Sequence, residues 1–216
     1  METIVADITC NPKEDEKIYE KAGEILRAGG LVAFPTETVY GLGGNGLNKE
    51  ASKKIYAAKG RPSDNPLILH IADMEQFYPL IKTDNAKIIA RAEALADVFW
   101  PGPLTMILPK ADNIPYETTG GLDTVAIRMP SHLVARALLQ ECKMPIAAPS
   151  ANLSGRPSPT SASHVIEDMN GRIEMIIDGG DVGIGVESTI IDLTGEVPML
   201  LRPGFVTPEM LQQVLG

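Results

Sequence analysis

Short apolar runs alternate with amphipathic segments along nearly the whole sequence, and this alternation limits the chain to a small set of folds. Leu31–Phe34 and Leu104–Leu108 have the length of buried strands, whereas residues 12–28 place apolar side chains on one helix face. Interleaved strands and helices are typical of α/β domains (α+β in some schemes). Because no repeat and no break in composition divides the chain, residues 1–216 are predicted to form one domain with a twisted mixed sheet and flanking helices.

Capping residues, prolines and glycines mark where the elements begin and end. We predict helices from Pro12 to the Gly29-Gly30 pair, and over residues 49–59, 85–99, 131–141 (capped by Ser131), 161–169, and from Pro208 onward with Thr207 as N-cap. Strands are predicted over residues 31–34, 66–71, 104–108, 124–128, 146–148, 175–177, 188–193 and 199–201. The glycine-rich stretch 41–46 is expected to lead into the second helix, and residues 178–187 are expected to form a loop.

The composition argues against broad nucleic-acid binding. A net charge of −9 repels phosphate backbones, and an aromatic content of 5% leaves few rings for base stacking. A local cationic pocket for one nucleotide is still compatible with these values. Cys10 and Cys142 match no metal-ligand spacing and are expected to be reduced, structural residues. Without a secretory signal or an apolar stretch of about 20 residues, the chain is predicted to be soluble and cytoplasmic, with no membrane contact.

A cationic segment follows the second predicted helix. Its two prolines favour extended backbone, which would turn the alternate side chains of Lys59, Arg61, Ser63 and Asn65 toward one region. Arginine and lysine there suit a polyphosphate, since one supplies a planar fork of donors and the other a mobile charge. A solvated loop, with Lys59 favouring the helix C-terminus, fits this segment equally well.

Further polar residues follow predicted strands, where ligands bind in open α/β sheets. Pro149–Asn152 and the nearby segment 154–158 carry hydroxyl and amide groups, although a capped turn would use the same residues. Arg128 and Arg202 each end a strand before a proline. Either arginine alone could be an exposed charge, but together with Lys59 and Arg61 they indicate convergence on an anionic ligand.

Several other chemistries are disfavoured. Residues 179–189 resemble a phosphate-binding loop only loosely, since they lack the Gly-Lys-Ser/Thr ending and precede a strand; a plain connection is the competing interpretation. His70 lies in an apolar strand and is typical of a satisfied buried histidine, and the three histidines show no zinc-site spacing. Ser150 has no nucleophile elbow, so covalent catalysis through serine or cysteine is not expected.

Six motifs occur in order and together resemble the YrdC-like family over the chain from about Ala28, with a core match to residue 204. They are Phe34–Leu42, Lys59–Leu67, Trp100–Thr105, Pro149–Asn152, Val186–Thr189 and Leu201–Gly204. The resemblance implies a twisted mixed sheet with a large concave cavity. It also implies a nucleotidyltransferase that condenses L-threonine, bicarbonate and ATP into threonylcarbamoyl-adenylate and pyrophosphate. That product serves the N6-threonylcarbamoyladenosine modification at position 37 of tRNA.

The resemblance also implies roles for particular residues. Those carried over for L-threonine are Thr38, His70, Arg128, Ala148 and Ser188. Those carried over for ATP are Lys59, Arg61, Asn65, Thr124, Ser150, Asn152, Ser158 and Arg202, with Lys59 and Arg61 also taken as catalytic. Mg²⁺ is expected to arrive on the ATP phosphates, without protein ligands. The expected partner is a downstream tRNA threonylcarbamoyl transferase complex, and direct tRNA contact is expected to be weak.

Alternatives stay open at this point. Longer family members continue into a linker and a second domain, so the chain is either a single-domain member or a longer protein cut after Gly216. A carbamoyl-transfer enzyme with another acceptor is the second hypothesis for the function. A non-enzymatic module that binds double-stranded RNA is the third, and the acidic charge and scarce aromatics disfavour it.

Overall fold

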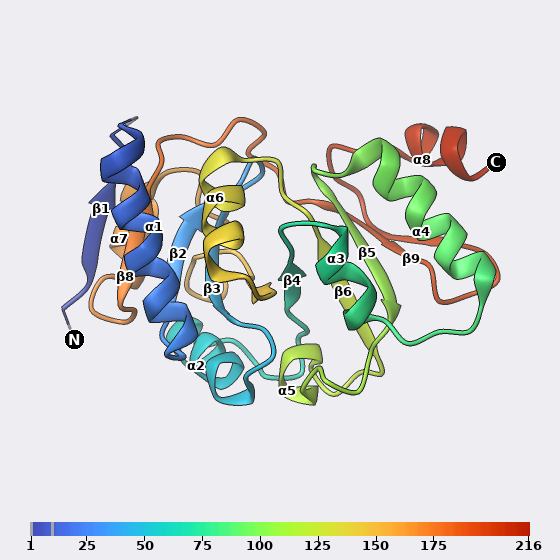
Figure 1. The fold of residues 1–216 in the computed structure, drawn as a ribbon, viewed down its shortest axis with the longest axis horizontal. Coiled ribbons are helices and arrows are strands. Elements are labelled where there is room, and N and C mark those ends of the chain that lie inside the picture. Colours follow the sequence, from blue (N-terminus) through green and yellow to red (C-terminus); the bar gives the residue numbers. More distant parts are fainter. Residues whose placement is uncertain (1, 10) are drawn as a thin grey trace.

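One mixed sheet forms the centre of the molecule. The computed structural model describes residues 2–9 and 11–216, so Cys10 lies outside the described residues. Within them, ten strands run in the order β1-β8-β2-β3-β7-β4-β6-β5-β9-β10 (Figure 1). Their bounds are β1 Ile4–Asp7, β2 Val32–Pro35, β3 Tyr40–Asn45, β4 Ile68–His70, β5 Leu104–Pro109, β6 Thr124–Arg128, β7 Ile146–Ala147, β8 Met175–Asp178, β9 Thr189–Asp192 and β10 Met199–Arg202.

Helices cover the sheet on both sides. They are α1 Pro12–Arg27, α2 Lys49–Lys59, α3 Met74–Phe77, η1 Tyr78–Leu80, α4 Ala86–Phe99, α5 Tyr116–Thr119, α6 Leu133–Cys142, α7 Ala162–Met169 and α8 Pro208–Leu215. Leu26 of α1 and Leu138 of α6 share a core cluster with Phe34 of β2, whereas Val165 of α7 packs with Ile176 of β8 in the other cluster. At the opposite end of the sheet, α4 and α8 lie side by side (Figure 1). The predicted α/β domain with a mixed sheet is confirmed.

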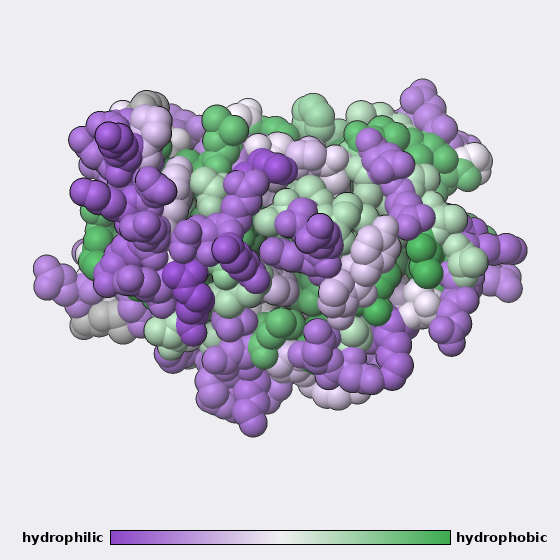
Figure 2. Space-filling model, in the orientation of Figure 1, coloured by the Kyte–Doolittle hydropathy of each residue, from purple (hydrophilic) through white to green (hydrophobic). Residues whose placement is uncertain are grey.

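One side of the molecule has a largely hydrophilic surface (Figure 2). Figure 2 shows hydrophilic side chains over the side of the molecule that carries α1 and α2. No helix within residues 2–9 and 11–216 is long and apolar enough to cross a membrane.

The cysteine that the structure describes, Cys142, is free and buried, and burial raises the pKa of its thiol to about 12. A thiol in this state is unreactive at neutral pH, which suits the structural role predicted for it.

Strand register places the candidate site at the middle of the sheet. β4 pairs with β6 in parallel, and His70 and Arg128 are direct register partners. β5 pairs with β6 on the other side, so Thr105 also stands opposite Arg128. β7 runs antiparallel to β4 and ends just before Pro149. At the predicted strand end, His70, Thr105 and Arg128 therefore lie side by side on neighbouring strands.

Capping chemistry predicted most helix ends correctly, and one cap was wrong. Helix α2 has the predicted bounds because the Asn48 side chain accepts from the Glu50 amide at 2.9 Å and Gly60 ends the helix with φ +59°. Ser131 does not cap α6; the N-cap is His132, whose Nδ1 accepts from the Val134 amide at 3.3 Å. The Ser131 amide is instead bound to a glutamate carboxylate of the site.

Strand β3 was missed because glycines do not read as strand residues. Its glycines leave room for neighbouring side chains: a Cβ on Gly43 would lie 2.8 Å from Phe34 Cε1 and 2.9 Å from Ile146 Cγ2. The same reason applies to Gly44, whose missing side chain makes space for Ile55. The sequence analysis also missed β1 and the single-turn elements α3, η1 and α5, which are too short to carry a period.

Gly43→Ala is expected to lower the free energy of unfolding by about 1–3 kcal/mol, because the added methyl overpacks the space between β2 and β7. Urea denaturation measures this loss. Gly183→Ala is the matched control, since a Cβ there meets nothing within 4 Å. The control should change stability by no more than about 0.5 kcal/mol. Equal effects of the two substitutions would contradict the packing explanation for β3.

Candidate functional site

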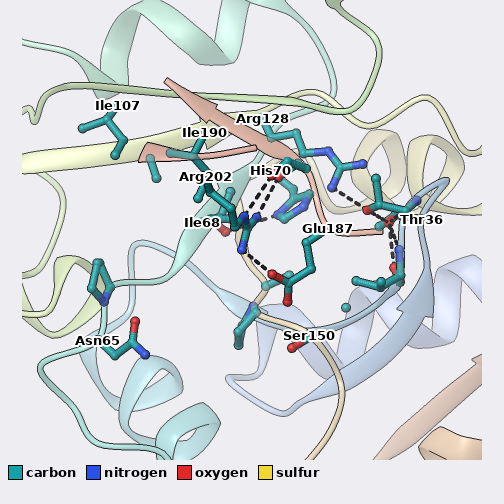
Figure 3. A pocket seen from close by; sticks show the side chains of 18 of the residues that line it. Thr36, Asn65, Ile68, His70, Ile107, Arg128, Ser150, Glu187, Ile190 and Arg202 are labelled. Carbon is teal, nitrogen blue, oxygen red and sulfur yellow. Dashed lines mark hydrogen bonds and ion pairs between the residues drawn. The ribbon is translucent and has the colours of Figure 1, made fainter. Parts of the chain in front are cut away.

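A pocket opens where β3, β4, β6 and β7 meet the start of β9 and the end of β10. Figure 3 shows Arg128, His70 and Arg202 around one space, with Glu187 beside Arg202 and Asn65 farther along the pocket. The lining residues are Thr36, Thr38, Val39, Gly41, Arg61, Asn65, Pro66, Ile68, His70, Ile107, Ala126, Arg128, Ala148, Pro149, Ser150, Glu187, Ser188, Ile190 and Arg202. Chain segments far apart in the sequence therefore contribute to one site.

Most of the residues predicted for the site lie in this pocket. All five residues predicted to bind L-threonine line it: Thr38, His70, Arg128, Ala148 and Ser188. Four of the eight residues predicted to bind ATP line it as well: Arg61, Asn65, Ser150 and Arg202. The other four, Lys59, Thr124, Asn152 and Ser158, are not in its lining. The convergence of arginines on one cavity agrees with the prediction, whereas the ligand assigned to each residue stays a prediction.

Arg128 is held at the pocket wall by a buried ion pair that sequence reasoning missed. One guanidinium nitrogen lies 2.5 Å from Glu37 Oε1, the other donates to Thr38 Oγ1 at 2.8 Å, and Nε donates to the Gly102 carbonyl at 3.3 Å. The second Glu37 oxygen accepts from the Ser131 amide at 3.1 Å. Burial acts to raise the pKa of Glu37, but the Arg128 charge and the hydrogen bonds outweigh it and lower the pKa.

Arg202 has a carboxylate partner at the mouth of the pocket. Its Nη1 lies 2.6 Å from Glu187 Oε2, while Nε donates to the Ser188 carbonyl at 2.9 Å and Nη2 donates to Ser188 Oγ at 3.1 Å. The Ser188 hydroxyl also shares a hydrogen bond of 2.7 Å with Thr105. Ser158 donates to the remaining Glu187 oxygen at 2.8 Å. Ser158 therefore reaches the site through Glu187.

Arg61 is the arginine of the described pocket lining that has no carboxylate within 4 Å. Its Nη2 donates to the Pro66 carbonyl at 3.2 Å, but its Nε is buried without a partner in the described residues. A buried N–H without a partner is costly, so this group is available to a ligand acceptor. The extended backbone predicted around Arg61 is wrong: Gly60 is left-handed and residues 62–65 form a turn, which leaves Ser63 exposed and outside the pocket.

Lys59 lies behind the pocket wall and is buried. Its ammonium donates to the Ser150 carbonyl, to the Asn152 carbonyl at 2.6 Å and to the Asn152 side chain at 3.4 Å. Burial, and then the charge of Arg61, lower the pKa of Lys59 to about 8. The lysine is thus a fixed charge beneath the Ser150 segment, unlike the mobile charge that the sequence analysis predicted.

His70 is both a buried core residue and part of the pocket. Its Nδ1 lies 3.2 Å from the Ile68 carbonyl, and the ring stands at 89° to Phe34 with 6.4 Å between centroids. Because a carbonyl only accepts, Nδ1 carries the proton and Nε2 is an acceptor. Burial, and then the charge of Arg128, lower the pKa of His70 to about 3, so the ring is neutral at physiological pH.

The loop between β8 and β9 is more than a plain connection. The amides of Ile184 and Gly185 donate to the carbonyls of Glu37 and Thr38 at 2.9 and 3.0 Å. These two amides are therefore occupied, and they hold the loop against the turn between β2 and β3. Sequence reasoning overlooked Glu37 and Glu187 because an acidic residue is not expected in an anion site. Their place inside two of the motifs was the available signal.

Curated relatives and a solved structure are similar to this chain over nearly its whole length. The threonylcarbamoyl-AMP synthase of Pyrococcus abyssi is 59% identical over 203 residues, which cover 94% of this chain and 58% of the relative. The threonylcarbamoyl-AMP synthase of Bacillus subtilis is 54% identical over 211 residues, which cover 97% of this chain and 60% of that relative. The crystal structure of P. abyssi Sua5 complexed with L-threonine matches with a TM-score of 0.92 at 54% identity, covering 100% of this chain and 61% of the other.

The mixed sheet and its pocket lined by three arginines define the class as an α/β protein with a cationic pocket at the middle of the sheet. The family model for Sua5, YciO and YrdC, described as "Telomere recombination", matches residues 24–204. The chain belongs to this family, which confirms the resemblance found in its motifs. It spans about three fifths of the length of the relatives named above.

Glu37→Gln is expected to lower the free energy of unfolding by about 3–5 kcal/mol, because it leaves the Arg128 charge buried without its partner. Chemical denaturation measures the loss. Glu24→Gln, which breaks an exposed pair with Lys21, is the control and should cost at most about 1 kcal/mol. A second substitution, Arg128→Met, should recover part of the loss from Glu37→Gln; additive losses in the double variant would contradict the pairing.

His70 gives stability a defined pH dependence. Its pKa is about 3 when folded, against an ordinary value of 6.5, so the unfolded chain binds more protons as the pH falls below 6.5. This contribution to the free energy of unfolding should decrease by about 1.4 kcal/mol per pH unit below that point. His70→Gln should flatten the curve measured by urea denaturation, whereas His164→Gln, an exposed position on α7, should retain the slope. Identical slopes in all three proteins would disprove the assignment.

Proposed function

We propose that the chain is an L-threonylcarbamoyladenylate synthase, a nucleotidyltransferase that condenses L-threonine, bicarbonate and ATP into threonylcarbamoyl-adenylate and pyrophosphate. The observation that carries the proposal is the meeting of Arg61, Arg128 and Arg202 in one pocket of an acidic protein. Arginine forks bind carboxylates and phosphates with geometric specificity. The relatives named threonylcarbamoyl-AMP synthase, and the related structure complexed with L-threonine, support this choice of ligands.

Threonine is assigned to the deep end of the pocket, with Thr38, His70, Arg128, Ala148 and Ser188. The Arg128 guanidinium has five N–H donors and uses three in the hydrogen bonds described above, which leaves two for a carboxylate. The neutral His70 offers an Nε2 acceptor to a hydroxyl or amine. Ala148, which is buried in the pocket wall, presents a small apolar surface. An acceptor for the threonine hydroxyl and a small surface beside its methyl group suit the selection of threonine.

ATP is assigned to the open end of the pocket. Arg61, Asn65, Ser150 and Arg202 line the pocket, and we assign them direct contact with the nucleotide. Lys59 contributes its charge from behind Ser150, so its catalytic role is electrostatic. Asn152 is assigned to positioning Lys59, and Ser158 acts through Glu187. Thr124 lies at the far end of β6 from Arg128, which assigns it to the nucleotide part most distant from the amino acid.

The proposed chemistry needs no covalent enzyme intermediate. The threonine amine attacks the bicarbonate carbon and water leaves, giving a carbamate. A carbamate oxygen then attacks the α-phosphorus, and the bond to pyrophosphate breaks. The protein contributes position and fixed positive charge, which stabilise the developing negative charge. Arg61 and Lys59 lie on the nucleotide side and Arg128 orients the amino acid.

Mg²⁺ is proposed to enter with ATP and to offset phosphate charge. The pocket fits such an ion, because Glu187 and the Ser150 hydroxyl provide the oxygen ligands that Mg²⁺ takes. Among the described residues, no group of three or more His, Cys, Asp or Glu side chains could form a metal site of its own. The metal is therefore assigned to the nucleotide complex.

The proposed product is consumed by a tRNA threonylcarbamoyl transferase complex that modifies position 37 of tRNA. The chain itself is assigned little direct contact with tRNA, because its net charge of −9 repels RNA phosphates. We assign the reaction to the cytoplasm, where ATP, bicarbonate and tRNA are available.

Pyrophosphate release from ATP and bicarbonate tests the proposal, and release is expected with L-threonine but not with L-serine or without an amino acid. Pyrophosphate release that does not depend on the amino acid would favour a carbamoyl-transfer enzyme with another acceptor. Salt-sensitive binding of double-stranded RNA without turnover would favour an RNA-binding module.

Binding measurements on variants test the assignment of the site. Arg61→Ala should weaken ATP binding and Arg128→Ala should mainly weaken threonine binding, each by roughly 10- to 100-fold, because each loses charge-assisted hydrogen bonds. Isothermal titration calorimetry measures both ligands. Arg172→Ala, an exposed position away from the pocket, is the matched control and should change neither affinity. If neither site variant changed either affinity, the assignment of the pocket would be wrong.

A further inference from the structure

The arginines of the pocket are largely neutralised before any ligand enters. Arg128 is paired with Glu37 at 2.5 Å, and Arg202 is paired with Glu187 at 2.6 Å. Arg61 keeps its charge uncompensated by any carboxylate within 4 Å in the described residues, and Lys59 adds a further charge from behind the wall. The pocket therefore presents about one to two net positive charges.

This charge does not match free ATP, which carries about four negative charges near neutral pH, since each phosphate is ionised. It does match the complex of ATP with a divalent cation, whose charge is about −2. The pocket would thus bind free ATP with a substantial excess of negative charge at its mouth. The Glu187 carboxylate, already included in this count, is the negative charge that a divalent cation would face.

We infer that Glu187 makes the nucleotide site selective for the complex of ATP with a divalent cation, by facing the cation with its carboxylate. The inference rests on the proposed assignment of ATP to this pocket. Glu187 lines the pocket and its side chain is 38% exposed, so a metal carried on the phosphates can reach it. Mg²⁺ is commonly held by one or two carboxylates together with substrate phosphates.

The contacts of Glu187 leave room for this role. One oxygen accepts from Ser158 at 2.8 Å and the other from Arg202 at 2.6 Å. An ionised carboxylate has about four lone-pair positions, so each oxygen retains one for a metal while keeping its present partner. Ser158 and Arg202 hold the carboxylate in place and thereby reduce the side-chain entropy that metal binding would cost.

Glu37, the other carboxylate of the site, is not suited to the same task. Its side chain is only 13% exposed, and it is not in the pocket lining. The difference between the two glutamates is therefore one of access. Glu37 fixes an arginine, whereas Glu187 meets the ligand.

Without a metal, the phosphates must compete with Glu187 for Arg202 and are repelled by the carboxylate. With a metal, the repulsion becomes attraction. Glu187→Gln removes the charge but keeps the size: its one carbonyl oxygen can accept from Arg202, and its amide N–H can donate to the Ser158 hydroxyl, which also accepts. The variant is therefore expected to bind free ATP more tightly and Mg-ATP more weakly than the original protein.

Isothermal titration calorimetry with ATP in EDTA and with ATP in excess Mg²⁺ tests the inference. The original protein should prefer Mg-ATP, and Glu187→Gln should reduce the ratio of the two affinities by about tenfold or more. Glu141→Gln is the matched control, because it alters a similarly exposed carboxylate that pairs with Arg27 away from the pocket. The control should keep the original ratio.

A direct readout of the metal complements calorimetry. Electron paramagnetic resonance of Mn²⁺ bound with ATP should show a protein-dependent signal that Glu187→Gln weakens and Glu187→Asp, which retains the charge, preserves in part. Circular dichroism checks that each variant is folded.

The outcomes separate the inference from the proposed function. If ATP binds but Glu187→Gln leaves the affinity ratio unchanged, the inference fails and the nucleotide assignment stands. If the original protein binds free ATP as tightly as Mg-ATP, the inference fails even when the variant does not fold. If the original protein binds ATP in neither condition, both the inference and the proposed function fail.

Discussion

The buried contact between Arg128 and Glu37 is the interaction on which the rest of the site depends. It joins the end of β6 to the turn between β2 and β3 at a point where both side chains are removed from water. An ion pair in this position is stable only when further hydrogen bonds satisfy both groups. Thr38, the Gly102 carbonyl and the Ser131 amide provide them. The beginning of α6 and the pocket wall are fixed as a result.

Charge compensation is consistent with the proposal that this acidic protein holds an anionic ligand. The chain carries a net charge of −9, yet Arg61, Arg128 and Arg202 lie in one pocket. Unpaired, these cations would repel each other across a poorly solvated space. Each of Arg128 and Arg202 therefore has a glutamate, and the ligand meets a modest net charge whose geometry is fixed in advance. Fixed geometry reduces the reorganisation that binding would otherwise require.

Local sequence rules predicted the elements whose ends are chemically marked. Helix α2, with its asparagine cap and Gly60, and strand β6 were predicted at their observed bounds. Strand β3 was not, because its glycines are explained only by the bulk of neighbours from distant segments. The same holds within the site. The motifs named the arginines, but their glutamate partners, the burial of Lys59 and the turn after Pro62 depend on contacts between segments far apart in the chain.

The main-chain bonds between Ile184 and Gly185 on one side and Glu37 and Thr38 on the other carry a consequence for how such a pocket can change. They connect the wall assigned to the amino acid with the loop that leads to Glu187, as adjacent strands of a sheet would. Remodelling one wall to admit a bulkier acid would displace the other by a similar amount. Variation among proteins with this scaffold is therefore expected to occur through side chains, with the backbone of both walls kept in register.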